Sequence, residues 1–454
     1  MTRLVLLLCC AGQFMVVLDV SIVNIALPDI FGDLRIANGS QEWVVNAYTI
    51  TVAGFLLLGG RAGDLLGRRR VFLSGLGLFT AASLIGGLAS SGGILIVARA
   101  LQGLGGAVVA PATLSVLNVT FTDPGRRRRA VGAWSMTAAS GAAAGVLIGG
   151  VLTNALGWRS VFLVNVPIGC AALMVAWRCL PSDGRPARTR GLDLPGACTI
   201  TAAIGTLTYA IVGVEHHPWT SAHTLGSLAL AAALLAAFVW IESSTAAHPL
   251  VPLRIFRQRQ VVVANLIALI IGASMFGVFY YLSLDLQGVA HDTPLMAGLS
   301  FLPAGLATFA SAVLAPRTVA FLGIRRQLAL GAFLVSAGSL WLSDLHTGAP
   351  YATYILGPLL LCGVGWGISF FPMTLAATAD VPSGEAGLVA GLVNTSRQLG
   401  GALGLAAAGA IVTASVAPAD PTPGYTAAWR FVSVAVLAAV ALCALLPGRQ
   451  PAAS

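Results

Sequence analysis

The chain has 454 residues, of which 57% are hydrophobic and only 9% are charged, whereas soluble proteins average about 25% charged residues. This composition excludes a set of soluble domains and indicates an integral membrane protein. The net charge of +9 does not indicate a nucleic-acid partner, because the basic residues are all arginine and lie mainly in alternate connections between apolar segments.

The first predicted element is an apolar segment that begins at Leu4 and continues to Pro28 without a cleavage site of the signal-peptidase type. We therefore expect it to remain as the first membrane helix. Asp19 interrupts this segment, and a carboxylate inside a membrane helix is costly and marks a candidate functional site. At 1.5 Å per residue, Asp19 lies about 22 Å from the inner end of the helix and about 8 Å short of the outer face.

Thirteen further apolar segments follow, separated by charged residues or by Pro and Gly breaks. With the first, they give fourteen predicted spans, which begin near residues 4, 43, 71, 93, 130, 159, 194, 223, 260, 295, 326, 351, 387 and 426. The predicted fold class is therefore all-α integral membrane. Because the arginine-rich connections join even to odd spans, the positive-inside rule places both termini in the cytoplasm.

An internal repeat is visible in two of these connections. The stretch GRAGDLLGRRR (60–70) follows the second span, and APRTVAFLGIRR (315–326) follows the tenth, so that Gly67 aligns with Gly323. The same shift superposes spans one to six on spans nine to fourteen. We predict two six-helix bundles, residues 1–180 and 260–454, with residues 181–259 forming an inserted pair of helices and its linkers.

Charged residues also lie inside later spans. Arg99 is about 9 Å deep in the fourth span, a depth similar to that of Asp19, so we expect these two side chains to form a buried pair, either functional or purely structural. Arg397 lies about 16 Å into the thirteenth span with no acid at matching depth, and both packing and substrate contact remain open for it. We expect the remaining acids near the spans to be solvated at interfaces: Asp285, Asp380 and Glu385.

Neither cysteine nor histidine indicates a metal site or a disulfide framework. The seven cysteines lie in or beside apolar segments without CxxC spacing, and the six histidines lie in predicted loops or helix ends. No phosphate-binding GxxxxGK[ST] loop is present, and the chain has no lysine from which one could be built. ATP-driven transport by this chain alone is therefore excluded, and we expect no cofactor and no metal.

Several motifs, in the expected order, resemble those of the major facilitator superfamily over nearly the whole chain. GRAGDLLGRRR matches the loop between helices two and three, and LDVSIVNIALPDI (18–30) resembles the first-helix signature of the fourteen-helix drug:proton antiporters. RALQGLGGA (99–107), GWRSVFLVNVPIG and NTSRQLGGALG resemble the motifs of helices four, six and thirteen. The helix-five stretch GAAAGVLIGG (141–150) departs from the antiporter motif, since Val146 stands where that motif has proline.

The resemblance implies alternating access with a substrate site between the two bundles, and proton-coupled export of small amphipathic organic compounds such as drugs or antibiotics. The alternative is a proton-coupled transporter of an endogenous metabolite, importer or exporter, on the same fold. In either case the resemblance implies a transporter and not an enzyme. The expected partners are a small-molecule substrate, protons and the lipid bilayer, without nucleic acid, for a monomer in a bacterial cell membrane.

We assign candidate roles on these grounds. Proton coupling is assigned to Asp19 and Arg99, because burial favours the neutral carboxyl group and the guanidinium favours the ionised one. Aromatic and polar residues are cavity or substrate candidates, although the aromatic ones are equally well explained by packing: Phe14, Met15, Asn24, Gln102, Phe276, Tyr280, Tyr281 and Arg397.

Two further sets of residues follow from the loop and helix-five motifs. The candidate gating loop contains Gly60, Asp64, Gly67, Arg68 and Arg69. Within it, the resemblance places Asp64 close to the start of helix thirteen, at PSGE (382–385). The helix-five glycines are expected to allow close helix packing: Gly141, Gly145, Gly149 and Gly150.

Overall fold

The computed structural model describes residues 2–36, 41–180, 193–212, 217–245, 249, 251–346, 348–379, 381, 386–415 and 422–446. Within these ranges the regular structure is helical and contains no strand, which confirms the predicted all-α class. Helices satisfy their backbone hydrogen bonds internally, and this is what an apolar chain requires inside a bilayer.

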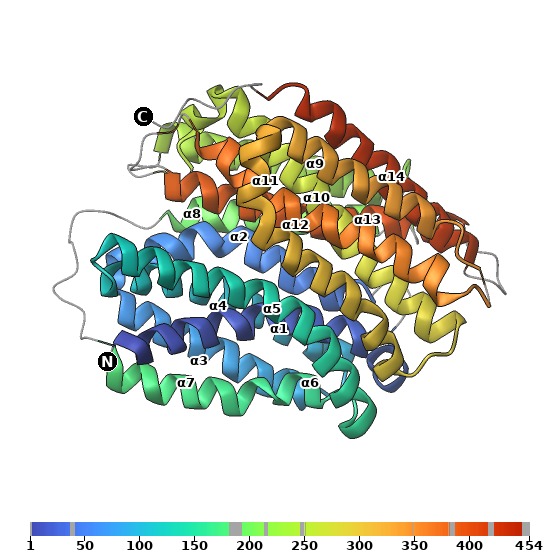
Figure 1. The fold of residues 1–454 in the computed structure, drawn as a ribbon, viewed down its shortest axis with the longest axis horizontal. Coiled ribbons are helices and arrows are strands. Elements are labelled where there is room, and N and C mark those ends of the chain that lie inside the picture. Colours follow the sequence, from blue (N-terminus) through green and yellow to red (C-terminus); the bar gives the residue numbers. More distant parts are fainter. Residues whose placement is uncertain are drawn as a thin grey trace. The chain divides into compact units, whose positions relative to one another are not determined.

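The chain divides into two compact units. The first contains Met1–Thr206 and Leu228–Pro252. Its first helices lie side by side in blue to green in Figure 1: α1 (Thr2–Leu34), α2 (Trp43–Leu66), α3 (Arg68–Gly87), α4 (Gly92–Thr120), α5 (Pro124–Leu156), α6 (Ser160–Leu163) and α7 (Asn165–Cys179). Residues of α8 (Leu194–Val212), of α9 (Ala222–Trp240) and of the short η3 (Ile241–Thr245) complete it.

The second unit contains Leu207–Ser227 and Leu253–Ser454, so α8 and α9 contribute residues to both units. The assignment of residues 181–259 to a separate inserted pair remains a prediction. The other elements of the second unit are η4 (Leu253–Arg257), α10 (Arg259–Leu284), η5 (Asp285–Val289), α11 (Pro294–Leu342), η6 (Ala352–Leu356), α12 (Gly357–Thr378), α13 (Ala386–Ser415) and α14 (Thr422–Cys443).

The fourteen predicted spans all fall on helices of the described chain. Eleven helices are long and apolar enough to cross a membrane, and α2 and α5 contain shorter apolar stretches. The 49-residue α11 contains both the tenth and the eleventh span. The two spans are separated at Gly323, where the backbone leaves the helical conformation. The sixth span, Ser160–Cys179, is continuous, since Val164 between α6 and α7 has helical backbone angles.

The predicted internal repeat reappears in the backbone conformation of two glycines. Gly67 separates α2 from α3 with φ of 100°, and Gly323 separates the two halves of α11 with φ of 75°. Residues with a side chain rarely adopt positive φ. The aligned glycines therefore allow the same tight turn at equivalent points of the two units.

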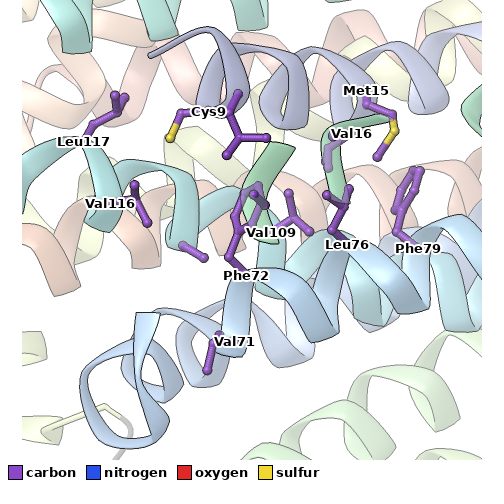
Figure 2. Close-up of a cluster of buried hydrophobic side chains, with 14 of the residues drawn as sticks. Cys9, Met15, Val16, Val71, Phe72, Leu76, Phe79, Val109, Val116 and Leu117 are labelled. Carbon is purple, nitrogen blue, oxygen red and sulfur yellow. The ribbon is translucent and has the colours of Figure 1, made fainter. Parts of the chain in front are cut away.

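A buried hydrophobic cluster joins α1, α3 and α4 in the first unit. Figure 2 shows Phe72, Leu76 and Phe79 of α3 facing Val109 of α4 and Met15 of α1. Met15 is only 1% exposed. Met15 therefore packs within this cluster, and its role as a cavity candidate remains a prediction.

The glycines of α5 let this helix approach the backbone of α1. A Cβ atom at Gly145 would lie 2.7 Å from Cβ of Ser21 and 2.9 Å from the carbonyl oxygen of Leu18. Gly141 and Gly149 meet α1 one turn to either side, and Gly150 is buried. The helix runs without interruption through Val146, from Pro124 to Leu156.

Candidate functional site

Asp19 of α1 and Arg99 of α4 form the buried ion pair expected from their depths. The guanidinium Nη1 lies 2.6 Å from Oδ2 of Asp19, and the side chains of Arg99 and Asp19 are 2% and 0% exposed. An unpaired charge here would carry the full cost of desolvation, whereas the pair is neutral overall. Each residue therefore allows the other to be buried.

Three further groups hold the guanidinium of Arg99. Its Nε donates to the carbonyl oxygen of Val44 at 3.0 Å, and its Nη1 also donates to Oε1 of Gln102 at 3.0 Å. Its Cζ lies 4.4 Å from the ring centroid of Tyr48, and the hydroxyl of Tyr48 donates to the carbonyl oxygen of Val16 at 3.4 Å. Arg99 is thus fixed by hydrogen bonds at its edge and by an aromatic ring.

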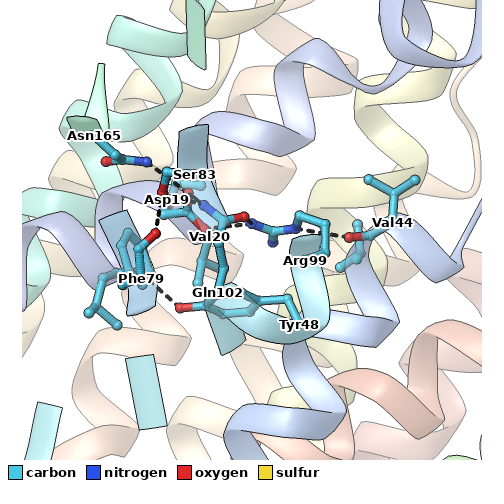
Figure 3. A network of polar contacts seen from close by, with 12 residues as sticks. Asp19, Val20, Val44, Tyr48, Phe79, Ser83, Arg99, Gln102 and Asn165 are labelled. Carbon is cyan, nitrogen blue, oxygen red and sulfur yellow. Dashed lines mark hydrogen bonds and ion pairs between the residues drawn. The ribbon is translucent and has the colours of Figure 1, made fainter. Parts of the chain in front are cut away.

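The second carboxylate oxygen of Asp19 accepts two amide donors. Nε2 of Gln102 lies 3.0 Å from Oδ1, and Nδ2 of Asn165 lies 2.9 Å from the same atom. Nε2 of Gln102 also donates to Oγ of Ser83 at 2.8 Å. Figure 3 shows this Asp19 network, which we define as Asp19, Tyr48, Ser83, Arg99, Gln102 and Asn165.

The Asp19 network lies entirely within the first unit, and all its members are buried. Arg99 remains charged under all ordinary conditions, and the amides and hydroxyls are neutral. Asp19 is therefore the one member that can gain or lose a proton at ordinary pH. The arrangement can bind a single proton beside a fixed positive charge.

Sequence reasoning missed Tyr48, Ser83 and Asn165. The available signal for Asn165 was its position in the helix-six stretch NVPIG, where an amide in an apolar span precedes Pro167. Proline cannot donate a backbone hydrogen bond, so one intrahelical bond is missing where α6 meets α7, although the backbone angles of Val164 are helical. For Tyr48 and Ser83 the sequence carried no comparable signal.

A second ion pair lies at the end of α1 and is exposed. Nη1 of Arg159 lies 2.7 Å from Oδ2 of Asp33, with side chains 44% and 48% exposed. Trp158 donates to the same carboxylate oxygen at 2.9 Å. Exposure of this pair contrasts with the burial of Asp19 and Arg99.

The cavity candidates of the second unit lie on α10 and α13. Phe276, Tyr280 and Tyr281 are 6%, 2% and 2% exposed, and the hydroxyl of Tyr281 donates to the carbonyl oxygen of Leu405 at 3.4 Å. A Cβ atom at Gly401 would lie 2.6 Å from the ring of Phe276. These three aromatic residues pack within the unit, and a role in substrate binding remains a prediction.

Arg397 finds its partners on and beside its own helix. Its Nη2 donates to Oδ1 of Asn394 at 2.7 Å, and its Cζ lies 5.2 Å from the ring centroid of Phe370. The guanidinium of Arg397 therefore contacts an amide oxygen and an aromatic ring where no acid at matching depth was found in the sequence.

The remaining candidates of the first unit are spread along α1, α2 and α3. Phe14 is half-buried against Gly141, and Nδ2 of Asn24 donates to the carbonyl oxygen of Val20 at 3.2 Å. In the loop region, Nη2 of Arg69 donates to the carbonyl oxygen of Trp177 at 2.6 Å. The other loop candidates lie at the α2–α3 junction, where Gly60 is half-buried in α2 and Arg68 is half-buried at the start of α3.

Three predictions concern residues whose side chains or whole placement fall outside the described parts. Asp64 lies in α2, but its side chain is not among those described, and neither are residues 382–385 or Asp380. The gating role of Asp64 therefore remains a prediction. Asp285, by contrast, is only 6% exposed in η5, which corrects the expectation that it is a solvated interfacial charge.

No group of three His, Cys, Asp or Glu side chains that could hold a metal ion occurs among the described residues. The arrangement that stands out chemically is therefore the Asp19 network. The network lies among the long apolar helices of the first unit. Both units contain a glycine with positive φ between two spans, Gly67 in the first and Gly323 in the second. This combination is that of a membrane transporter.

The chain belongs to the Major Facilitator Superfamily, whose family model matches residues 9–405. It is 41% identical over 446 residues to the cephamycin export protein CmcT of Amycolatopsis lactamdurans, covering 97% of this chain and 92% of the relative. It is 38% identical to the puromycin resistance protein pur8 of Streptomyces alboniger, with 98% and 91% covered. The lincomycin resistance protein of Streptomyces lincolnensis is 34% identical, with 97% and 91% covered.

Solved structures of the same fold are similar over nearly their whole length. A mutant of the nucleoside transporter NupG superposes with a TM-score of 0.71 at 10% identity, covering 98% of this chain and 100% of the other. A D-xylose-proton symporter gives 0.69 at 14% identity, with 98% of each chain covered. The family and fold predictions are thus confirmed, and the chain is a bacterial-type multi-span transporter rather than an enzyme.

Proposed function

We propose that this protein exports small amphipathic antibiotic-class compounds in exchange for protons, and that Asp19 carries the coupling proton. The observation that supports the proposal most directly is the neutral, buried Asp19–Arg99 pair with its amide donors. The likeness to relatives named for cephamycin export and for puromycin and lincomycin resistance supports the substrate class.

Coupling follows from the charge balance of the network. When Asp19 is ionised, its charge cancels that of Arg99, and when it binds a proton the site carries one net positive charge. A buried site strongly disfavours uncompensated charge, so the proton's affinity depends on whether water or a charged substrate reaches it. Protonation and substrate binding then become alternatives, and this makes exchange obligatory.

The available driving force is sufficient for export. A membrane potential of about 150 mV supplies about 3.5 kcal/mol for each charge moved. Each unit of pH difference adds about 1.4 kcal/mol per proton. One proton can therefore sustain a substrate gradient of several hundredfold.

We further propose cytoplasmic termini, because the arginine-rich connections favour that side, and a bacterial cell-membrane location, because the relatives are bacterial. A monomer remains our expectation. The position of Arg257 in η4 offers a test. A cysteine placed there in a cysteine-free background is expected to react with an impermeant reagent only in inverted vesicles. Labelling in intact cells would contradict this orientation.

The substrate class is tested by growth inhibition in an efflux-deficient bacterial host. The panel contains puromycin, lincomycin and a cephamycin, and each strain carries the chain, an Asp19→Asn variant or an empty vector. We expect higher tolerance to at least one compound with the chain alone. Equal tolerance in all three strains would contradict the proposed export of these compounds.

Coupling is tested in inverted vesicles with the compound that the panel identifies. We expect the chain to accumulate it when the lumen is acidic and to release luminal protons as it does so. Asp19→Asn at matched expression is expected to abolish both signals. Substrate-driven proton release that persists in Asp19→Asn would assign the coupling proton to another group, and movement in the opposite direction would indicate an importer.

A further inference from the structure

Asn165 is the amide of the Asp19 network that uses only half of its hydrogen-bonding groups. Its Nδ2 donates to Oδ1 of Asp19 at 2.9 Å, whereas its own Oδ1 is buried and has no hydrogen-bond partner within the described chain. The residue is fully buried. A buried amide oxygen without a partner is costly and requires an explanation.

Gln102 provides the contrast, because both ends of its amide are held. Its Nε2 donates to Asp19 and to Ser83, and its Oε1 accepts from Arg99. Turning this amide over would break all three hydrogen bonds. Gln102 is therefore fixed in one orientation, whereas Asn165 loses only one bond when it turns.

Protonation of Asp19 changes what its neighbours must supply. The Oδ2 atom accepts from Arg99 at 2.6 Å, and a guanidinium can never become an acceptor, whereas the carboxamide of Asn165 beside Oδ1 can. We therefore place the incoming proton on Oδ1. A new O–H donor then points from an oxygen whose two partners, Gln102 and Asn165, are both donors. An acceptor is required within hydrogen-bond distance of that oxygen.

We propose that Asn165 is a positioning residue that turns its carboxamide over when Asp19 binds a proton. In the ionised state its NH₂ donates to the carboxylate. After a rotation of about 180° its Oδ1 accepts the O–H of the carboxylic acid, since the amide can serve either role. The proton leaves a hydronium ion, which becomes water, and forms one O–H bond to Asp19, and one hydrogen bond between the two residues is present in both states.

The unpaired oxygen of Asn165 is thereby explained as the acceptor that the protonated site needs. Its place at the first position of α7 and its hydrogen bond to Oδ1 of Asp19 set the amide beside the carboxylate. The inference rests on the proposed role of Asp19 as proton carrier. Loss of Asn165 is expected to lower the exchange rate about tenfold, because the O–H of the protonated Asp19 then has no acceptor.

The test is infrared difference spectroscopy between alkaline and acidic pH on the full-length protein in lipid vesicles. Asparagine is labelled with ¹³C at its side-chain carbonyl so that its C=O band is separated from the carboxyl bands. We expect acidification to produce an Asp19 carboxylic-acid band. We also expect one asparagine C=O band to move to lower frequency as its oxygen gains a hydrogen bond.

Variants assign the bands and supply the control. The asparagine band is expected to be absent in Asn165→Leu and to stop responding to pH in Asp19→Asn. It should persist in Ser83→Ala, which removes a partner of Gln102 but leaves Asn165 and Asp19 intact. If Asn165→Leu does not fold, Asn165→Ser serves the same assignment, because serine has no carbonyl in its side chain.

The two proposals fail in distinguishable ways. An Asp19 acid band without a change in the Asn165 carbonyl would overturn the turning amide and leave the proton carrier in place. Absence of any Asp19-dependent acid band over the pH range of transport would overturn the proton carrier itself. A shift of the Asn165 band that persists in Asp19→Asn would also contradict the inference.

Discussion

The guanidinium of Arg99 lies over the ring of Tyr48, with 4.4 Å between Cζ and the ring centroid. This contact does not depend on the charge of Asp19, whereas the ion pair does. When Asp19 binds a proton, Arg99 loses its counterion but keeps the negative face of the ring beside it. Tyr48 therefore reduces the cost of the protonated state.

Substitutions at Tyr48 separate the ring from its hydroxyl. We expect Tyr48→Phe to retain most of the exchange rate, because the hydroxyl makes only a 3.4 Å hydrogen bond to Val16. Tyr48→Leu is expected to lower the rate about tenfold, since a desolvated cation–π contact contributes about 1–2 kcal/mol. Initial rates in inverted vesicles at matched expression provide the comparison. Equal losses in both variants would assign the effect to the hydroxyl instead.

The buried pair predicts a strong dependence of stability on keeping both partners. Arg99→Gln leaves the Asp19 carboxylate buried without its counterion and is expected to cost about 3–5 kcal/mol of folding free energy. The double variant Asp19→Asn with Arg99→Gln is expected to recover part of this loss, which thermal unfolding would measure. Arg159→Gln is the matched control, because its pair with Asp33 is exposed and its loss should change little.

Geometry rather than charge alone is expected to matter at position 99. Arg99→Lys keeps the charge but loses the planar fork that reaches Val44, Gln102 and Asp19 together. We expect at least a tenfold loss of proton-driven export, whereas Asp19→Glu should keep part of it. Export by Arg99→Lys at the rate of the unmodified chain would show that a point charge is sufficient.

Close packing between α1 and α5 predicts a cost for a single methyl group at Gly145. Its Cβ would lie 2.7 Å from Cβ of Ser21 and 2.9 Å from the carbonyl oxygen of Leu18. Because the contact includes backbone, Gly145→Ala is expected to cost about 1–3 kcal/mol. Gly77→Ala in α3 is the control, since nothing lies within 4 Å of its added Cβ. Equal melting temperatures for the two variants would contradict this packing.

The aligned glycines at the turns predict a paired effect. Gly67→Ala and Gly323→Ala each force a side chain into positive φ and are expected to cost about 1–2 kcal/mol. The loss should be similar in the two variants if the turns are equivalent, which thermal unfolding of both would measure. A loss at only one position would indicate that the repeat in sequence is not a repeat in conformation.

The pattern of apolar segments predicted the helices well because a bilayer imposes one requirement on every span. Length and hydropathy therefore located helices at all fourteen positions, and the fixed rise per residue brought Asp19 and Arg99 to the same level. The break at Gly323 was also expected, since it lies between the tenth and eleventh predicted spans. What length and hydropathy do not record is how the helices rotate against one another.

The neighbours of Asp19 were only partly predictable for a related reason. Depth along a helix follows from residue number, but the face that a residue presents depends on how helices rotate and pack. Gln102 follows Arg99 by one turn and was named only as a cavity candidate, whereas Ser83 and Asn165 lie on separate helices and were not named. Asp285 does lie near a helix end, as its residue number indicates. The expectation that it is solvated was wrong because its burial depends on the packing around η5.

Among the described residues, the members of the Asp19 network and their hydrogen-bond partners all belong to the first unit, and this gives the two halves of the gene different freedom to vary. Under the proposed function, substitutions in residues 253–454 can alter which compounds are expelled without touching the chemistry that powers expulsion. Selection experiments that broaden resistance are expected to enrich mutations in that half while leaving Asp19, Arg99 and Asn165 unaltered.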